Sequence, residues 1–337
     1  MKSAAEKASL RSLIAGFAAK RTLVIGDLML DEFIWGKVSR ISPEAPVPVV
    51  NVSGESYYPG GAANVARNVR EFTAGAAVMG RTGGDAHGQR LLDLLKAQGV
   101  DASAALRDPA YSTAVKTRII ARNQQVVRVD RESTEPLSGA QTERAMRLLD
   151  GMIGAVDALI VADYGKGFVT QPLADYICRA AREHGKILTV DPHPHTSLRW
   201  RGATAIKPNR AEALAAAGLP STEPAGPPLD DGPLLDTGKR LLDLWETESL
   251  LITLGEQGML LFSQGAPPYH TPARAREVFD VSGAGDTAIA VFTLGLAAGT
   301  TPAEAAELAN RASGIVVGKI GTATVTAAEL EAVCAGL

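Results

Sequence analysis

The chain has 337 residues, of which 46% are hydrophobic and 21% are charged, and it carries a formal net charge of −3 at pH 7. These values are typical of a globular protein with a large core, and the slightly negative charge argues against a nucleic-acid-binding surface. The two cysteines form no C-x-x-C pair, so neither a disulfide framework nor a zinc site is predicted.

The N-terminal segment lacks the pattern of a signal peptide, because Glu6, Lys7 and Arg11 interrupt its apolar residues. The longest uncharged run, 287–303, contains glycines and a proline and indicates a buried helix rather than a membrane span. We therefore expect a cytoplasmic protein with no membrane partner and no nucleic-acid partner.

The first buried strand is predicted at 23–25, an apolar run typical of the centre of a parallel sheet. Asp27 and Asp31 follow it. Ligands of open α/β sheets bind beyond the carboxyl ends of the strands, so both carboxylates are candidates to hold the hydroxyl groups of a polyol. The alternative for Asp27 is that it only caps a turn.

Residues 33–59 have prolines among alternating valines, which is typical of edge strands or of a small separate sheet, and we predict a lid here. Gly60 and Gly61 then precede a helix. The backbone N–H groups of this turn and the side-chain amide of Asn64 are candidate ligand contacts. A glycine turn before an ordinary helix is the alternative.

Residues 113–131 are the most basic part of the chain and predict a β-hairpin of two β-branched strands. Two-residue alternation places Lys116, Arg118 and Arg122 on one face of the first strand. Clustered cations on a lid favour a substrate that already carries an anionic group such as a phosphate. An ordinary solvated face is the alternative.

From residue 138 onward, helices alternate with strands. Helices are predicted at about 138–154 and 170–183, and strands at 158–161 and 187–190. This alternation predicts an α/β fold: a doubly wound, mostly parallel sheet flanked by helices, with a small β-sheet lid. Asp163 follows one of these strands and is a further candidate to hold a hydroxyl group.

Two further turns precede the last third of the chain. Asn209 and Glu212 lie at a predicted helix start, and their spacing is also that of a capping box. After the strand 250–253, Gly255 and Gly258 predict a tight turn. This turn is either structural or borders a nucleotide.

The segment 280–287, Asp-Val-Ser-Gly-Ala-Gly-Asp-Thr, predicts a strand end, a glycine turn and a helix start. Gly283 and Gly285 allow the backbone to approach a ligand, and the first N–H groups of the helix form an anion site. Asp286 suits a reaction in which it takes a proton from an attacking hydroxyl group. The alternatives are a helix N-cap and a dinucleotide-binding turn, and the second is disfavoured because no acidic residue follows until Glu304.

Together, the segments 60–64, 209–212 and 280–286 resemble the ribokinase-like (PfkB) family of carbohydrate kinases. The resemblance covers nearly the whole chain, and its last segment is highly specific. It implies a single kinase domain, 1–337, with the two lid segments inserted within it. It also implies that Asp286 is the catalytic base.

The same resemblance implies ATP and Mg²⁺ as cofactors and leaves open whether a monovalent cation is needed. The N–H groups of Gly283, Ala284 and Gly285 would form an anion hole for the transferred group. Glu212 would act on the metal indirectly, through water or phosphate. The implied nucleotide-binding residues are Asn209, Glu212, Thr253, Gly255, Gly258 and Asn310.

Within the family, the chain resembles most the heptose 7-phosphate kinases of lipopolysaccharide-core synthesis, through the segments 26–31, 40–50, 122–125 and 282–287. Ser282 departs from the pattern, because threonine is frequent there. The implied reaction is phosphorylation of the anomeric hydroxyl of D-glycero-β-D-manno-heptose 7-phosphate to the 1,7-bisphosphate. A kinase for fructose phosphate, ribose or a nucleoside is the alternative, and a non-catalytic sugar or nucleotide sensor is a remote one.

Related kinases pair through their lids, so a homodimer is expected. The sequence contains no His-x-Gly-His, so a separate adenylyltransferase is expected to act later in the pathway. The implied sugar-phosphate site comprises Asp27, Asp31, Gly60, Gly61, Asn64, Lys116, Arg118, Arg122 and Asp163.

Overall fold

A computed structural model describes residues 4–122, 124–194, 196, 198–221, 223–224, 226–274, 278–319 and 321–335. Asn123, which belongs to the predicted hairpin turn and to the segment 122–125, lies outside the described residues. The helices are α1 (Ala4–Phe17), α2 (Ala62–Arg70), α3 (Ala86–Ala97), α4 (Gly139–Ile153), α5 (Gln171–Glu183), α6 (Arg210–Ala216), α7 (Gly232–Trp245), α8 (Ala284–Ala297), α9 (Pro302–Val316) and α10 (Ala327–Ala335), with a 3-10 turn at Gly255–Gln257.

An eight-stranded sheet forms the centre of the molecule, in the order β14-β13-β12-β11-β10-β9-β1-β4. Neighbouring strands from β4 to β12 are parallel, and β13 and β14 are antiparallel. The predicted α/β fold with a mostly parallel sheet is therefore confirmed. Its strands are β1 (Arg21–Gly26), β4 (Gly75–Met79), β9 (Ala158–Ala162), β10 (Ile187–Asp191), β11 (Ala205–Ile206), β12 (Ser249–Thr253), β13 (Met259–Ser263) and β14 (Tyr269–Thr271).

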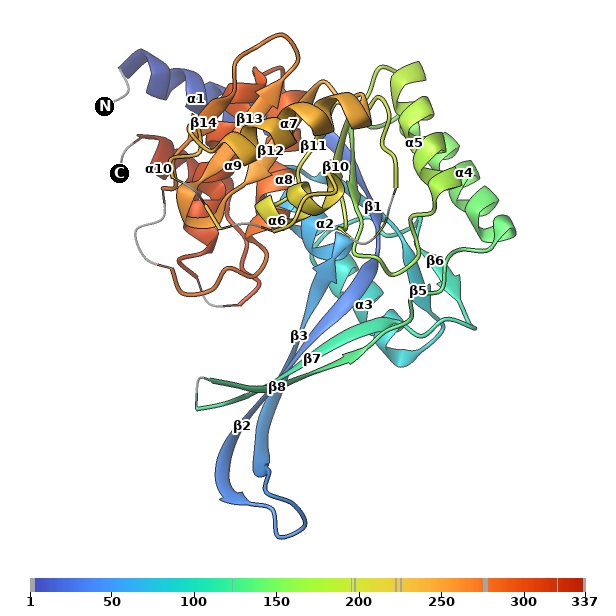
Figure 1. Cartoon of the computed structure of the whole chain (residues 1–337). Coiled ribbons are helices and arrows are strands. Elements are labelled where there is room, and N and C mark those ends of the chain that lie inside the picture. The colour runs from blue at the N-terminus through green and yellow to red at the C-terminus, as the bar shows by residue number, and fades with distance from the viewer. Residues whose placement is uncertain are drawn as a thin grey trace.

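Helices cover both faces of this sheet (Figure 1). Successive side chains of a strand point to opposite faces, and β1 shows the result. Leu23 and Ile25 pack in one core cluster with α4, α5 and α7, whereas Val24 packs in another with α1, α2, α8, α9 and α10. Both faces are apolar, which explains why the strand reads as a continuous hydrophobic run.

A separate four-stranded sheet, in the order β3-β2-β7-β8, extends away from the helices (Figure 1). β2 pairs antiparallel with β3 and parallel with β7, and β7 pairs antiparallel with β8. The predicted hairpin is thus present, and the segment 33–59 contains parts of two long strands of the same sheet and the connection 42–47 between them. These strands are β2 (Leu28–Ile41), β3 (Pro48–Gly61), β7 (Ala114–Ala121) and β8 (Gln124–Arg131), and a two-stranded sheet contains β5 (Arg81–Gly83) and β6 (Leu106–Asp108).

The uncharged run 287–303 is divided between α8 and α9, which end and begin within it. Among the described residues, no helix has the length and apolar composition needed to cross a bilayer.

Candidate active site

The eight-stranded sheet has a switch point between β1 and β9. From β1 the chain continues to β4 on one side of β1, and it later enters β9 on the other side. Ligands of open α/β sheets bind at such a switch point, beyond the carboxyl ends of the strands. Asp27 follows β1 and Asp163 follows β9, so both predicted residues lie at this point.

Two side-chain donors hold Asp286 at this site. The amide of Asn64 donates to Oδ2 at 2.6 Å, and the hydroxyl of Tyr164 donates to Oδ1 at 2.5 Å. One turn further along α2, Asn68 Oδ1 accepts a hydrogen bond from Thr287 Oγ1 at 2.7 Å. The structure therefore brings the predicted residues Asn64 and Asp286 together, and it adds Tyr164, which the sequence analysis did not identify.

Burial raises the pKa of Asp286 from its ordinary value of 3.8 to about 6, although the hydrogen bonds from Tyr164 and Asn64 lower it. The negative charge of Asp191 raises this pKa further, and the positive charge of Lys207 lowers it. A carboxylate with a pKa near 6 is ionised at neutral pH and is a stronger base than an exposed one. These properties suit a general base that takes a proton from a hydroxyl group.

The predicted anion site lies at the start of α8. Gly283 is the N-cap residue with a φ of 80°, a left-handed conformation that glycine favours, and no side chain among the described residues caps this helix. The first N–H groups of α8 therefore have no partner within the helix and can bind an anion. A Cβ atom at Gly285 would lie 3.4 Å from Lys207 Nζ, so an ammonium group adjoins the anion site.

Lys207 is a second residue that the sequence analysis did not identify. It follows β11, is 4% exposed, and places Nζ 3.0 Å from Asp191 Oδ1. Burial raises the pKa of Asp191 to about 6, although the charge of Lys207 lowers it. A buried cation beside a helix N-terminus adds to the attraction for a phosphate group. Its place at a strand end, two residues before Asn209, is the sequence signal that points to it.

Asp27 organises a loop in this structure. It is 2% exposed, and its carboxylate accepts N–H hydrogen bonds from Tyr164 at 2.8 Å, Lys166 at 3.0 Å and Phe168 at 3.0 Å. These donors fix the loop 163–168 after β9. The observed contacts are those of the turn-capping alternative, and a direct contact between Asp27 and a sugar stays a prediction.

Asp163 shapes the same loop. Its Oδ1 accepts the N–H of Gly165 at 2.9 Å, and its Oδ2 accepts the hydroxyl of Thr196 at 2.5 Å. Burial raises the pKa of Asp163 to about 6, although both hydrogen bonds lower it. The predicted contact between Asp163 and a sugar hydroxyl also stays a prediction.

The double glycine allows β3 to pass close to two aspartates before α2 begins. A Cβ atom at Gly60 would lie 2.5 Å from Asp31 Oδ2. A Cβ atom at Gly61, which has a φ of 59°, would lie 2.6 Å from the carbonyl oxygen of Asp27. Asp31 is buried and forms an ion pair with Arg118 of β7. The structure thus groups Gly60, Gly61, Asp31 and Arg118 beside the switch point.

The cations of the hairpin do not all lie together. Lys116 is the direct cross-strand partner of Asp31 and therefore faces the same side of the four-stranded sheet. Arg122 lies in the hairpin turn with a φ of 49° and lines a surface pocket with Trp35. The register shift between β7 and β8 leaves Val126 of β8 without a partner in this pairing, whereas β7 pairs with β2 without a shift as far as Ala121. The prediction that Arg122 shares the strand face of Lys116 and Arg118 stays a prediction, because β7 ends at Ala121, before that residue.

A pocket of about 420 Å³ adjoins the anion site. Ala284 and Gly285 at the start of α8 line one side of it. Its volume is within the range of small-molecule binding sites. Four predicted nucleotide-binding residues line it as well: Thr253, Gly255, Gly258 and Asn310.

Asn209 and Glu212 form a complete capping box at the start of α6. Asn209 Oδ1 accepts the N–H of Glu212 at 2.9 Å, and Glu212 Oε2 accepts the N–H of Asn209 at 2.7 Å. Neither residue belongs to the described lining of the 420 Å³ pocket, although Asn209 pairs with Thr253 through an isolated bridge. The observed role is helix capping, and the role in ATP binding stays a prediction.

The described residues contain no group of three or more His, Cys, Asp or Glu side chains that could hold a metal ion. Mg²⁺ does not require such a group, because it keeps several waters and binds through one or two carboxylates plus the phosphates of a nucleotide. Asp191, which pairs with Lys207 beside the anion site, and Glu212 are the carboxylates that would hold Mg²⁺ in this way.

Comparisons with known proteins agree with this geometry. Residues 19–329 match the pfkB family carbohydrate kinases. A bifunctional protein HldE from Desulfatibacillum aliphaticivorans is 45% identical over 316 residues, which are 94% of this chain and 63% of that protein. A bifunctional protein HldE from Geobacter sulfurreducens is 42% identical over 325 residues, which are 96% of this chain and 65% of that protein. The chain thus spans less than two thirds of the length of these relatives.

Solved structures show the same fold at lower identity. The structure of phosphofructokinase-2 from Escherichia coli in complex with substrates and products superposes with a TM-score of 0.74 at 18% identity. The alignment covers 95% of this chain and 99% of the phosphofructokinase-2 chain. Ribokinase from Thermotoga maritima superposes with a TM-score of 0.70 at 18% identity, and the alignment covers 93% of this chain and 98% of the ribokinase chain. Because the family match covers most of the sequence, this protein belongs to the pfkB family of carbohydrate kinases and transfers a phosphoryl group to a sugar hydroxyl.

Proposed function

We propose that this protein uses ATP to phosphorylate the anomeric hydroxyl of D-glycero-β-D-manno-heptose 7-phosphate, giving the 1,7-bisphosphate used for ADP-heptose and the lipopolysaccharide core. The observation that supports the proposal is a buried carboxylate, Asp286, in the first turn of α8 beside the anion site, together with a face of the four-stranded sheet that bears Lys116 and Arg118. A phosphorylated acceptor is complementary to these cations. The segments 26–31 and 40–50 add the likeness to heptose 7-phosphate kinases.

In the proposed reaction, Asp286 takes the proton of the anomeric hydroxyl group. The hydroxyl oxygen forms a bond to the γ-phosphorus of ATP, the bond from that phosphorus to the bridging oxygen breaks, and ADP leaves. The N–H groups at the start of α8 and the ammonium group of Lys207 stabilise the charge on the transferred group. Mg²⁺, held through Glu212, Asp191 and water, would neutralise part of the nucleotide charge.

The acceptor would lie between α2 and the four-stranded sheet. Asn64 Oδ1 is buried and has no hydrogen-bond partner in the described part of the chain, so it can accept a hydrogen bond from a sugar hydroxyl. Asp31 and Arg118 lie at the same face of the sheet. In this proposal the chain acts as one kinase unit, and the four-stranded sheet is the lid that excludes water from the reaction.

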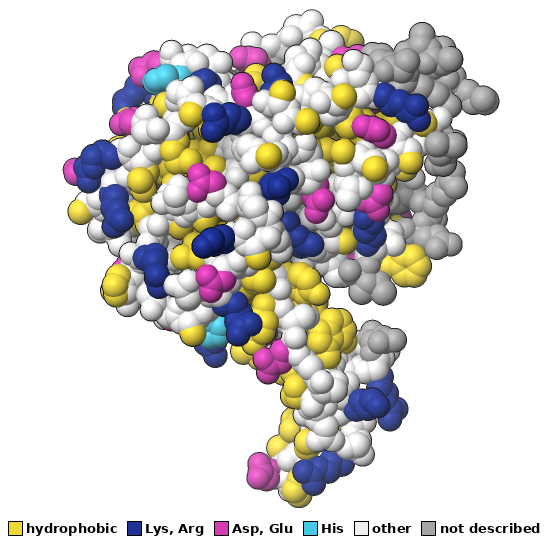
Figure 2. All heavy atoms as spheres, turned by 180° about the vertical axis from the view of Figure 1, so that it is seen from behind, with side chains coloured by type: hydrophobic (Ala, Val, Ile, Leu, Met, Phe, Trp, Pro, Cys, Tyr) yellow, Lys and Arg dark blue, Asp and Glu magenta, His cyan; other side chains and the backbone are white. Residues whose placement is uncertain are grey.

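We also propose that the protein forms a homodimer through the outer face of the four-stranded sheet. The cross-strand register places Ile119, Val127 and Val129 on the face opposite Lys116 and Arg118. Val127 and Val129 are 45% and 49% exposed, and Figure 2 shows apolar side chains gathered on the protruding sheet. Exposed apolar faces of this kind mark interaction surfaces. A Val129→Glu variant that sediments like the unaltered protein would contradict this proposal.

The adenylyltransferase that acts later in the pathway is proposed to lie outside residues 1–337. The HldE relatives are named bifunctional, and this chain matches less than two thirds of their length. A second activity is therefore assigned to a part of those relatives that residues 1–337 do not match.

A substrate panel tests the proposed function. ADP release is measured with heptose 7-phosphate, fructose 6-phosphate, ribose and a nucleoside, and phosphorus NMR identifies the phosphorylated position. We expect the highest kcat/KM with heptose 7-phosphate and a product phosphorylated at the anomeric carbon. A higher kcat/KM with fructose 6-phosphate, ribose or the nucleoside would assign the alternative, a kinase of the same family with another acceptor.

A further inference from the structure

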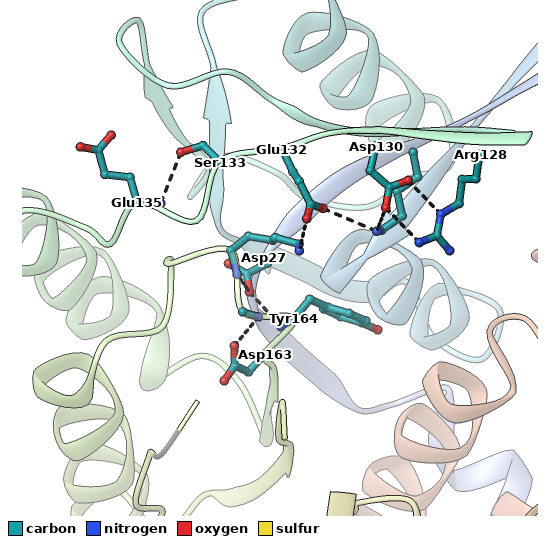
Figure 3. A network of polar contacts seen from close by, with 11 residues as sticks. Asp27, Arg128, Asp130, Glu132, Ser133, Glu135, Asp163 and Tyr164 are labelled. Atoms are coloured by element: carbon teal, nitrogen blue, oxygen red, sulfur yellow. Dashed lines mark hydrogen bonds and ion pairs between the residues drawn. The ribbon is translucent and has the colours of Figure 1, made fainter. Parts of the chain in front are cut away.

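Two lysines share one carboxylate where the two sheets meet (Figure 3). Lys166 Nζ lies 2.8 Å from Glu132 Oε1, and Lys116 Nζ lies 3.6 Å from Glu132 Oε2. The side chains of Lys166 and Lys116 are only 13% and 20% exposed. Ammonium groups so far from solvent need a paired anion. Glu132 therefore occupies an anion site between the two lysines, and another anion could occupy the same site.

The lysine pair keeps a positive excess around this place. Lys116 has a second partner, Asp130 Oδ2, at 3.2 Å, and Asp130 is itself paired with Arg128 at 2.8 Å. The cluster thus combines the cations Lys116, Lys166 and Arg128 with the carboxylates Asp130 and Glu132. If Glu132 moves away, the remaining charge suits a dianion such as a phosphate ester.

The lysine pair adjoins the catalytic base. Lys166 and Tyr164 are two residues apart in the loop after β9, so their Cα atoms are at most about 7 Å apart. Tyr164 donates to Asp286, whereas Lys166 points to Glu132. Lys116 lies beside them on the inner face of the four-stranded sheet. The loop after β9 thus carries both the residue that contacts the base and one lysine of the pair, and the proposal requires one small molecule to reach the base with a hydroxyl group and the lysine pair with an anionic group.

Glu132 can leave this place without breaking a strand. It follows the last residue of β8 and begins the segment 132–138, which has no regular secondary structure. Burial raises the pKa of Glu132, but the hydrogen bond from Lys166 and the charges of both lysines lower it below its ordinary value. The side chain is therefore ionised at neutral pH and offers the lysines two oxygen acceptors, as a phosphate would.

We propose that Lys166 and Lys116 bind the phosphate group that the sugar substrate already carries, and that Glu132 occupies this phosphate site until the substrate displaces it. The inference rests on the proposed function in one respect, namely that the acceptor is a phosphorylated sugar. A phosphate group brings more charge and more acceptor oxygens than a carboxylate, so it can displace Glu132. A free sugar cannot, and Glu132 thus disfavours unphosphorylated acceptors.

Kinetics of two variants test this site. Lys166→Met should raise KM for the phosphorylated sugar roughly 10- to 100-fold, because a charge-assisted hydrogen bond is lost, and should leave KM for the free sugar unchanged. Glu132→Gln should lower KM for the phosphorylated sugar, because the competing anion is gone. Lys239→Met, at an exposed position in α7, is the matched control and should change neither value.

Equal changes in KM for the phosphorylated and the free sugar would overturn the proposal. In that case the lysine pair and Glu132 are only a structural ion-pair cluster. The melting temperature provides the second readout, since a purely structural cluster predicts a lower melting temperature in both Lys166→Met and Glu132→Gln. A lower KM in Glu132→Gln despite a lower melting temperature would support the phosphate site.

Binding of inorganic phosphate separates this inference from the choice of sugar. Calorimetry is done with a non-hydrolysable ATP analogue present, so that the anion site at α8 is filled. Phosphate should bind more tightly to Glu132→Gln and should not bind to Lys166→Met. If heptose 7-phosphate is not turned over but phosphate binding depends on Lys166, only the proposed function fails. If heptose 7-phosphate is turned over and Lys166→Met changes neither KM nor phosphate binding, only this inference fails.

Discussion

The two sheets differ in how much of each strand is buried. In the eight-stranded sheet, β9 is buried at every residue, whereas β8 of the four-stranded sheet is exposed at every residue. A strand packed between two helix layers is held in one position by close contacts on both faces. β8 is an edge strand that is held mainly by its pairing with β7. Groups whose positions must be fixed therefore belong to the first sheet and its helices.

The site follows this difference. Asp286, Lys207 and the N–H groups of α8 lie on elements packed against the eight-stranded sheet. Lys116 and Arg118 lie on the four-stranded sheet. We therefore expect the first group to set the rate of phosphoryl transfer for every acceptor, and the second group to decide which acceptor binds. Substitutions can break or sharpen this division.

The largest effect is expected for Asp286→Asn. Loss of a general base should lower kcat by roughly 10²- to 10⁴-fold for every acceptor, with ATP binding retained. The melting temperature should rise, because a buried carboxylate with a raised pKa is costly to ionise. Steady-state ADP release and thermal unfolding measure both quantities. A near-normal kcat in this variant would contradict the assignment of Asp286 as the general base.

The next largest effect is expected on KM, and it should differ between Lys116 and Arg122 of the hairpin. Lys116→Ala should raise KM for a sugar phosphate roughly 10- to 100-fold and leave kcat nearly unchanged, because a charge-assisted contact is lost. Arg122→Ala is the matched control, since Arg122 lies in the hairpin turn beside Trp35. Substrate-saturation curves for both variants test this. A large change in KM for Arg122→Ala would show that the hairpin turn also contacts the acceptor, and a large change in kcat for Lys116→Ala would contradict the division between the two sheets.

A smaller effect is expected for Tyr164→Phe. The variant loses one hydrogen bond to Asp286, which should lower kcat about 10-fold, the lower end for a bond to a charged group. In the unaltered protein this hydrogen bond lowers the pKa of Asp286. Its loss should raise that pKa, so the acid side of the pH–rate profile should move to higher pH. If Tyr164 only filled space, kcat and the pH profile would both stay unchanged.

The smallest effect concerns pH in the unaltered protein. Asp286 must be ionised to accept a proton, so kcat/KM should rise with pH up to about 6 and then level off.

The stability of the protein should also depend on pH, because the folded-state pKa values of Asp286, Asp191 and Asp163 are raised from 3.8 to about 6. The folded protein therefore holds these protons between about pH 4 and 6, where the unfolded chain has released them. The contribution of these three carboxyl groups to the free energy of unfolding is fully present below pH 4 and is lost as the pH rises through 6.

Periodic segments of the sequence predicted most of the fold. The apolar run 23–25 and the alternation after residue 138 gave strands and helices within a few residues of those observed, because burial on both faces of a parallel sheet leaves a local pattern. The segment 280–287 predicted a glycine turn and helix start, since Gly283 needs its left-handed conformation, but the strand end predicted with them is wrong, because the described residues 278–283 contain no strand. Local conformation of this kind depends on adjacent residues and is visible in the sequence.

Contacts between distant segments could not be predicted in the same way. Tyr164 and Asp286 are 122 positions apart, and the N–H donors of Asp27 lie 137 to 141 positions away. No periodic pattern encodes such pairs, which arise when β1, β9 and α8 converge at the switch point. For Arg122, alternation along β7 could not decide the position of the side chain, because the strand ends at Ala121 and Arg122 belongs to the turn.

On the proposed role of Glu212 at the metal, the capping box of α6 would link nucleotide binding to the order of a helix end. In this structure Glu212 closes on the N–H of Asn209, so a Glu212 that turns toward a metal-bound water must release that N–H. Loss of one such hydrogen bond costs about 1 kcal/mol, while Asn209 still caps the helix. Saturation with nucleotide would then speed hydrogen exchange at the first amides of α6 while it slows exchange around the 420 Å³ pocket. On this reasoning, occupancy of the nucleotide site would be followed from the first turn of α6, which does not line the 420 Å³ pocket.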